Sequence, residues 1–153
     1  MTVLLVVAHC LLNPGTRLKG LKSVNFDHDV EAPLIQLPCP EAGYLGLERW
    51  AVTKNQLDVP NYRRYCREVI LHQADLIEQF FRQGSKIKVV GVAGSPNCGV
   101  ESTTLGYHGG RVWAEPHKHV SGRGIFMEEV HRELVLRGVK FQFVEVGENK
   151  VED

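Results

Sequence analysis

The sequence has no excess of charge of either sign. Its 153 residues include 18 Lys and Arg against 18 Asp and Glu, so the formal net charge at pH 7 is zero. A protein that attracts phosphate backbones or anionic membrane surfaces by electrostatics needs a strong positive field. We therefore expect neither bulk nucleic acid nor a membrane as a partner, and the composition leaves the oligomeric state open.

Long hydrophobic runs are also missing. The first apolar run, residues 3–8, is far shorter than the roughly 20 residues that a membrane-spanning helix needs. It lacks the basic segment and the small-residue cleavage site of an export signal. We expect a buried strand here and a cytoplasmic protein, in which thiols stay reduced.

The chain has neither internal repeats nor low-complexity segments. Hydrophobic residues make up 43% and charged residues 24%, which is typical of globular proteins rather than disordered ones. A chain of this length suits one hydrophobic core. We expect a single domain over residues 1–153.

Segments with the patterns of strands and helices alternate along the chain, which favours a layered α/β fold. The expected strands cover residues 2–8, 32–37, 87–93 and 140–146. The first and third are β-branched runs without polar alternation, as in strands covered on both faces. We predict a three-layer, Rossmann-like α/β fold with a small, mostly parallel sheet.

Two helices are expected between these strands. Apolar residues recur at steps of three and four over residues 61–83 and again over residues 124–137, and a glycine follows each segment. Residues 40–60 and 99–123 fit neither pattern. Irregular stretches this long in a compact domain are usually functional.

Cysteine is scarce, with four residues and no C-x-x-C pair, so zinc-finger spacing is absent. Cys10, Cys39 and Cys98 each follow one of the first three expected strands. Because ligands of open parallel sheets bind outside the carboxyl ends of the strands, these three thiols are expected to share one site. The alternative is that they are merely buried, as Cys66 is expected to be on the apolar face of the first long helix.

Three thiolates suit two kinds of bound group. Zinc takes four ligands, so three cysteines would leave a position for water or for His9, which otherwise could help to orient its neighbour Cys10. An iron–sulfur cluster held by three cysteines would leave one iron free. Soft thiolates bind either group, and the residues alone leave both open.

Three short motifs carry a family resemblance. They are C-L-L-N-P-G-T-R-L-K-G at residues 10–20, C-P-E at residues 39–41 and S-P-N-C-G at residues 95–99. In order and spacing they resemble the C-L-x-G-x-x-C-R-Y-D-G, C-P-E and S-P-S-C-G motifs of the small bacterial and archaeal desulfidases related to 2-thiouracil desulfidase. The resemblance spans roughly the first two-thirds of the chain.

The first motif departs from the family pattern. Thr16 stands in place of its second cysteine, and Leu18 and Lys19 stand in place of its tyrosine and aspartate. Three candidate cysteine ligands remain. The departures imply a different substrate or a divergent subfamily, so thiouracil itself is not the expected substrate.

The resemblance implies a 4Fe-4S cluster bound by Cys10, Cys39 and Cys98. It further implies hydrolytic removal of sulfur from a small thiolated compound, such as a thiolated nucleobase, with release of sulfide. Glu41 and Ser95 would be the catalytic proton-transfer groups. In the alternative, Glu41 caps a turn, Ser95 bonds to its own loop and the chain is a non-catalytic module that binds zinc or an iron–sulfur cluster.

Two further groups of residues are ambiguous. His108, His117 and His119 could bind zinc, line a substrate pocket in which Tyr107 and Trp113 stack on a heterocycle, or lie singly on the surface. The segment at residues 15–20 could meet an anionic group, although it does not match a P-loop. We expect it to be a glycine-flanked turn with solvated Arg17 and Lys19.

Overall fold

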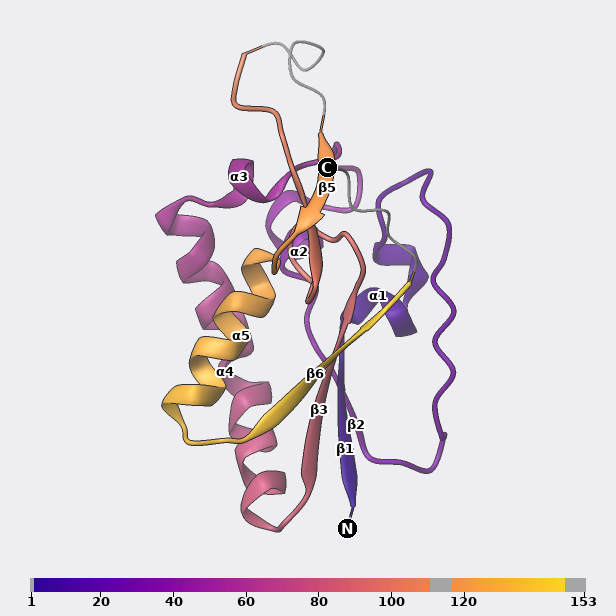
Figure 1. Cartoon of the computed structure of the whole chain (residues 1–153), viewed down its shortest axis with the longest axis vertical. Coiled ribbons are helices and arrows are strands. Elements are labelled where there is room, and N and C mark those ends of the chain that lie inside the picture. Colours follow the sequence, from indigo (N-terminus) through magenta and orange to yellow (C-terminus); the bar gives the residue numbers. More distant parts are fainter. Residues whose placement is uncertain (1, 111–116, 148–153) are drawn as a thin grey trace.

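Four parallel strands form the main sheet in the computed structural model, which describes residues 2–110 and 117–147. They are β1 (Val3–Val7), β2 (Leu34–Gln36), β3 (Lys86–Val92) and β6 (Phe141–Val146), in the order β2-β1-β3-β6. Three of them lie within an expected strand segment, and β3 begins one residue before its expected segment. The predicted α/β fold with a small parallel sheet is confirmed (Figure 1).

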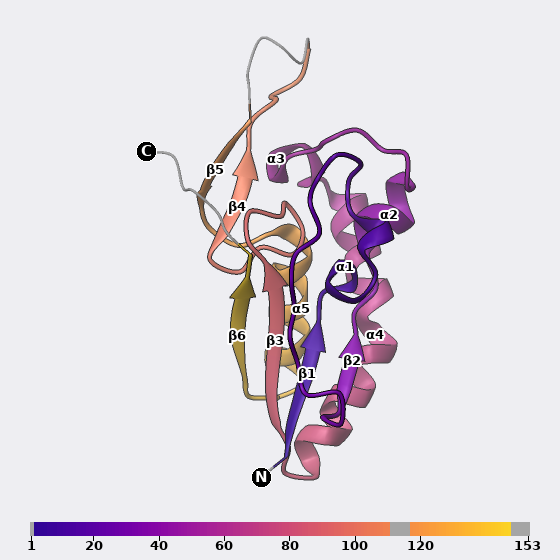
Figure 2. The same ribbon diagram turned by 90° about the vertical axis from the view of Figure 1, so that its right-hand side faces the viewer.

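The connections between these strands cover the two faces of the sheet. Helices α4 (Pro60–Arg82) and α5 (Ile125–Leu136) cover one face, and the connection at residues 17–33 runs across the other (Figures 1 and 2). The chain steps from β1 to β2 in one direction and then back past β1 to β3 and β6. Because crossovers are right-handed, this reversal places the connections on opposite faces. The layer opposite the helices is therefore mainly irregular chain.

The expected helical periodicity accounts for α4. Its buried residues recur every three or four positions, and Gly84 follows it with a φ of +94°, a conformation that favours glycine. The buried positions are Tyr62, Cys66, Ile70, Ala74 and Ile77. Cys66 is completely buried among them, so its predicted place in the core is confirmed.

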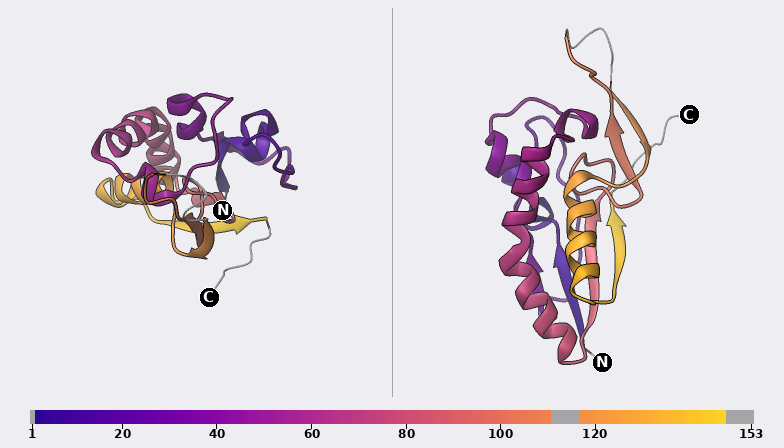
Figure 3. Two further views of the ribbon diagram at one scale, coloured as in Figure 1. Left: turned by 90° about the horizontal axis from the view of Figure 1, so that it is seen from above. Right: turned by 90° about the vertical axis from the view of Figure 1, so that its left-hand side faces the viewer.

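The two unassigned stretches contain short elements. The stretch at residues 40–60 contains α2 (Pro40–Leu45) and α3 (Lys54–Leu57), between β2 and α4. Two other short helices, α1 (His9–Leu12) and η1 (Pro14–Thr16), follow β1. Strands β4 (Ser102–Leu105) and β5 (Lys118–Ser121) form an antiparallel pair. Figure 3 shows α2, α3 and this pair beyond the carboxyl ends of the parallel strands. No helix in the described ranges has the length and apolar character needed to cross a membrane.

Candidate functional site

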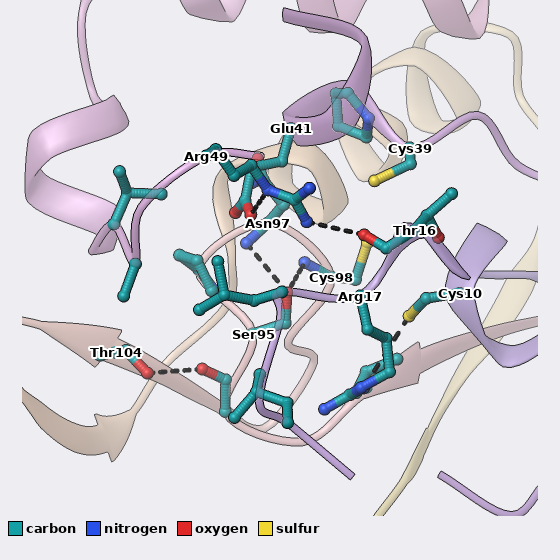
Figure 4. Close-up of a pocket in the computed structure, with 18 of the residues that line it drawn as sticks. Cys10, Thr16, Arg17, Cys39, Glu41, Arg49, Ser95, Asn97, Cys98 and Thr104 are labelled. Carbon is teal, nitrogen blue, oxygen red and sulfur yellow. Dashed lines mark hydrogen bonds and ion pairs between the residues drawn. The ribbon is translucent and has the colours of Figure 1, made fainter. Parts of the chain in front are cut away.

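A cavity of about 420 Å³ lies at the carboxyl ends of the parallel strands (Figure 4). The strand order reverses at β1, which has β2 on one side and β3 on the other. In sheets of this kind, ligands bind at the point of reversal. All five site residues expected from the sequence line the cavity: Cys10, Cys39, Glu41, Ser95 and Cys98.

Cys10 lies in α1 directly after β1, and its neighbour His9 is held by the last residue of β2 and the residue that follows it. The Nδ1 atom of the preceding His9 lies 3.0 Å from the carbonyl oxygen of Leu37, and the Gln36 amide donates to the carbonyl oxygen of His9 over 3.0 Å. A hydrogen on Nδ1 would donate to Leu37 and fix the ring orientation. His9 thus links the loops that carry Cys10 and Cys39.

Cys39 is the N-cap residue of α2, with Pro40 in the first turn. Its sulfur accepts a hydrogen bond from the backbone N–H of Ala42 over 3.4 Å. This contact satisfies one of the free donors at the start of a helix. The short helix therefore orients the Cys39 sulfur and sets Glu41 in its first turn.

Cys98 lies in a tight loop after β3. Its backbone N–H donates to the Ser95 hydroxyl oxygen over 2.9 Å, and its carbonyl oxygen accepts from the backbone N–H of Val92 over 2.8 Å. A Cβ atom at Gly91 would lie 2.3 Å from this carbonyl oxygen, so the close return of the loop requires glycine at residue 91.

Burial raises the pKa of each of the three thiols, most strongly for Cys98. The pKa of Cys98 is raised further by the charges of Cys10 and Cys39. Arg17 opposes the rise in the pKa of Cys10, and the Ala42 N–H opposes it for Cys39. The thiols are close enough to influence one another, and a bound cationic group would favour their thiolate forms.

The three thiols line one cavity, and soft thiolates suit an iron–sulfur cluster or zinc. Within the described ranges, no group of three or more His, Cys, Asp and Glu side chains is placed to hold one metal ion. Thiolates around one zinc would lie within about 4 Å of each other, since the Zn–S distance is about 2.3 Å. In a cluster, each cysteine binds a different iron and the sulfurs are farther apart.

Arg17 is a cavity residue rather than a solvated one, so that expectation was wrong. Its terminal nitrogen lies 4.0 Å from the Cys10 sulfur, and its buried Nε has no hydrogen-bond partner in the described part of the chain. A half-buried cationic donor beside a thiol suits an anionic group in the cavity. Lys19 is exposed, as expected, and pairs with Glu48.

Glu41 is fixed by two donors that the sequence analysis missed. Arg49 forms an ion pair with Glu41 Oε2, and the Asn97 amide donates to Oε1 over 3.0 Å. Arg49 also donates to the Thr16 carbonyl oxygen over 2.8 Å. Asn97 directly precedes Cys98 in the S-P-N-C-G motif, so its place near the site could have been predicted from the sequence. Arg49 carried none, because its partners are brought together only by the loops.

Ser95 has the local role that was considered as an alternative. Its hydroxyl oxygen accepts from the backbone N–H groups of Asn97, at 3.2 Å, and Cys98, at 2.9 Å. Both bonds use the oxygen as acceptor, so the hydroxyl hydrogen is available to a group in the cavity. The loop geometry and a proton-donating role are therefore compatible.

The late histidines separate into two groups. His117 and His119 line the cavity with Tyr107, whereas His108 is exposed and its Nδ1 lies 3.4 Å from the Asn55 amide nitrogen. The expected stacking residue Trp113 lies outside the described residues.

Comparisons with known proteins bear on the fold. No family model matches the chain. An uncharacterized protein of Methanocaldococcus jannaschii is 26% identical, over 95% of this chain and 86% of that protein. The solved structure of the 4Fe-4S-dependent thiouracil desulfidase TudS has a TM-score of 0.56 and 23% identity, over 94% of this chain and 91% of that one. The resemblance is confirmed at the level of the fold.

Proposed function

We propose that the protein is a desulfidase that hydrolytically removes sulfur from a small thiolated compound, such as a thiolated nucleobase, and releases sulfide. The observation that carries the proposal is that Cys10, Cys39, Cys98, Glu41 and Ser95 line one cavity. The fold similarity to TudS supports the same reaction class.

The three cysteines are the proposed ligands of a 4Fe-4S cluster. When bound by three thiolates, such a cluster supplies an open iron that can accept the substrate sulfur as a Lewis acid. Arg17 lies beside the Cys10 sulfur and offers positive charge to the anionic thiolates.

Glu41 is the proposed base for the attacking water. Its two oxygens already accept from Arg49 and Asn97, and each keeps a further lone pair for a proton. Because both donors are protein groups, the carboxylate keeps its orientation without substrate. A fixed acceptor at the cavity wall is suited to general base catalysis.

Ser95 is the proposed proton donor to the heterocycle. Its oxygen is fixed by two backbone N–H groups, so its hydrogen can be directed towards the cavity. Apolar side chains, among them Leu18, Leu21 and Val52, contribute to the rest of the lining. Such walls limit water around the reacting groups and strengthen electrostatic interactions there.

Anaerobic purification with iron and sulfide analysis tests the cluster. We expect about four irons per chain, the cluster size named above, and loss of iron and brown colour in Cys98→Ala. The matched control is Cys66→Ala, which changes the buried cysteine of α4 and should keep the iron. Colourless wild-type protein that contains only zinc would instead support a non-catalytic metal-binding module.

Catalysis is tested on the cluster-loaded protein with a panel of thiolated pyrimidines. Sulfide release from at least one of them is expected. The second product is the corresponding pyrimidine in which a carbonyl replaces the thiocarbonyl. A loaded protein that releases no sulfide from any of them would contradict the proposed activity on nucleobases.

A further inference from the structure

Tyr107 has an unusual backbone conformation. Its φ is +53°, and among the described residues it is the only one other than glycine with a positive φ. This left-handed region is costly for a residue with a large side chain, and such strain is concentrated at functional sites. Other contacts must therefore hold Tyr107 in this conformation, and the residue is a candidate for a functional role.

The cause is the short helix α3. The buried hydroxyl of its N-cap residue Thr53 donates to the Gly106 carbonyl oxygen over 2.7 Å, and the Gly106 N–H donates to Asn55 Oδ1 over 2.8 Å. The Asn55 amide also lies 3.5 Å from the Tyr107 carbonyl oxygen. These contacts fix the backbone on either side of the Tyr107 nitrogen.

Tyr107 and His117 form an aromatic pair at the cavity, in which Tyr107 is half-buried and His117 is exposed. The Tyr107 hydroxyl lies 2.8 Å from His117 Nδ1, and the two rings meet edge to face with centroids 5.5 Å apart. Both residues line the cavity that contains the cysteines. A phenol and a neutral imidazole carry two polar hydrogens, of which their shared bond uses one. One donor therefore remains for a ligand.

We propose that Tyr107 and His117 form the surface that recognises the ring of the substrate. The aromatic faces suit a planar heterocycle, and the remaining donor suits a ring carbonyl or ring nitrogen. The inference rests on the proposed function for the nature of the substrate. It adds that a heterocyclic ring, rather than an open-chain thioamide, is the ligand, and that α3 positions Tyr107.

Equilibrium binding of uracil and cytosine tests this surface. These rings lack sulfur and cannot be desulfurated, so calorimetry on the cluster-loaded protein measures recognition alone. Tyr107→Gly removes the ring in a backbone conformation that glycine readily adopts, and we expect uracil or cytosine to bind about tenfold more weakly or worse. Tyr107→Phe keeps the ring and should have a smaller effect than Tyr107→Gly.

Two further variants complete the design. His117→Ala should also weaken binding of the ring, whereas Trp50→Leu changes an aromatic side chain that is 89% exposed and should leave it unchanged. Unchanged affinity in both Tyr107→Gly and His117→Ala would overturn the inference. So would a wild-type protein that binds neither ring saturably.

The same samples separate this inference from the proposed function. Iron content and sulfide release report on the cluster and the reaction, whereas calorimetry reports on the ring surface. A protein that releases sulfide but binds neither ring fails only the inference. A cluster-loaded protein that binds a ring but releases no sulfide from any thiolated pyrimidine fails only the proposed function.

Discussion

The side-chain amide of Asn97 donates to Glu41 Oε1 over 3.0 Å and so joins the S-P-N-C-G loop to the C-P-E helix. Asn97 is itself held by the Tyr62 hydroxyl of α4, which donates to its Oδ1 over 2.7 Å. The chain of bonds therefore connects the core helix to the cavity. The position of the Glu41 carboxylate depends on residues that do not themselves need to react.

Replacement of Glu41 by glutamine should abolish most sulfide release. The substitution keeps the size of the side chain but removes the base, and general base catalysis contributes about 100-fold or more. Kinetics of sulfide release and iron content are measured together. Glu48→Gln is the control, because that side chain is 86% exposed and pairs with the exposed Lys19. If Glu41→Gln released sulfide at the wild-type rate, Glu41 would not be the general base.

Ser95→Ala should lower both activity and stability. Two backbone N–H groups lose their acceptor, which should cost about 1 to 2 kcal/mol in the free energy of unfolding. Urea denaturation measures this cost, and Ser23→Ala at an exposed position is the control. If the variant keeps its iron and turns over substrate at the wild-type rate, Ser95 has only the structural role.

Tyr62→Phe should destabilise the protein and disturb the cavity. The buried Asn97 loses the donor to its Oδ1, and an unsatisfied buried polar group costs about 1 to 3 kcal/mol. Tyr65→Phe is the control on the same helix, since the Tyr65 side chain is only partly buried. Urea midpoints that fall equally for the two variants would argue against the importance of the Tyr62 bond.

Stability should depend on pH through His131. Burial, and then the charge of Arg123, lowers the pKa of His131 from 6.5, and its ring stacks on Phe143. The unfolded chain therefore binds more protons between the folded pKa and 6.5. The free energy of unfolding should fall as pH decreases through this window and rise as pH increases.

The measurement is urea denaturation at a series of pH values around 6.5. His131→Leu should remove this part of the pH dependence, whereas His72→Leu at an exposed position should keep it. An identical pH slope in the wild type and His131→Leu would show that other groups control the dependence.

Local pattern was enough to predict the main elements. The β-branched run at β1 and the periodic apolar face of α4 depend on side chains near in sequence, so their structures could be read directly. The convergence of Cys10, Cys39 and Cys98 could also be anticipated, because parallel strands end at the same edge of a sheet.

Short elements and the contacts of the cavity were not predictable in this way. Helix α3 has four residues, too few for a periodic pattern, yet it holds Tyr107 in its left-handed conformation. Arg17 was expected in solvent because a charged residue in a turn is usually hydrated. Its burial depends on the loops packed around it.

The sequence by itself determined the parallel sheet, the two long helices and the edge at which the cysteines meet. Only the tertiary structure decided that Arg49 and Asn97 hold Glu41, that Arg17 lies beside Cys10 and that Tyr107 meets His117. The physical reason is the sequence separation of the residues that interact. Secondary structure follows from hydrophobic periodicity over neighbouring residues, whereas these polar contacts join residues from separate loops whose positions are set by packing of the whole core.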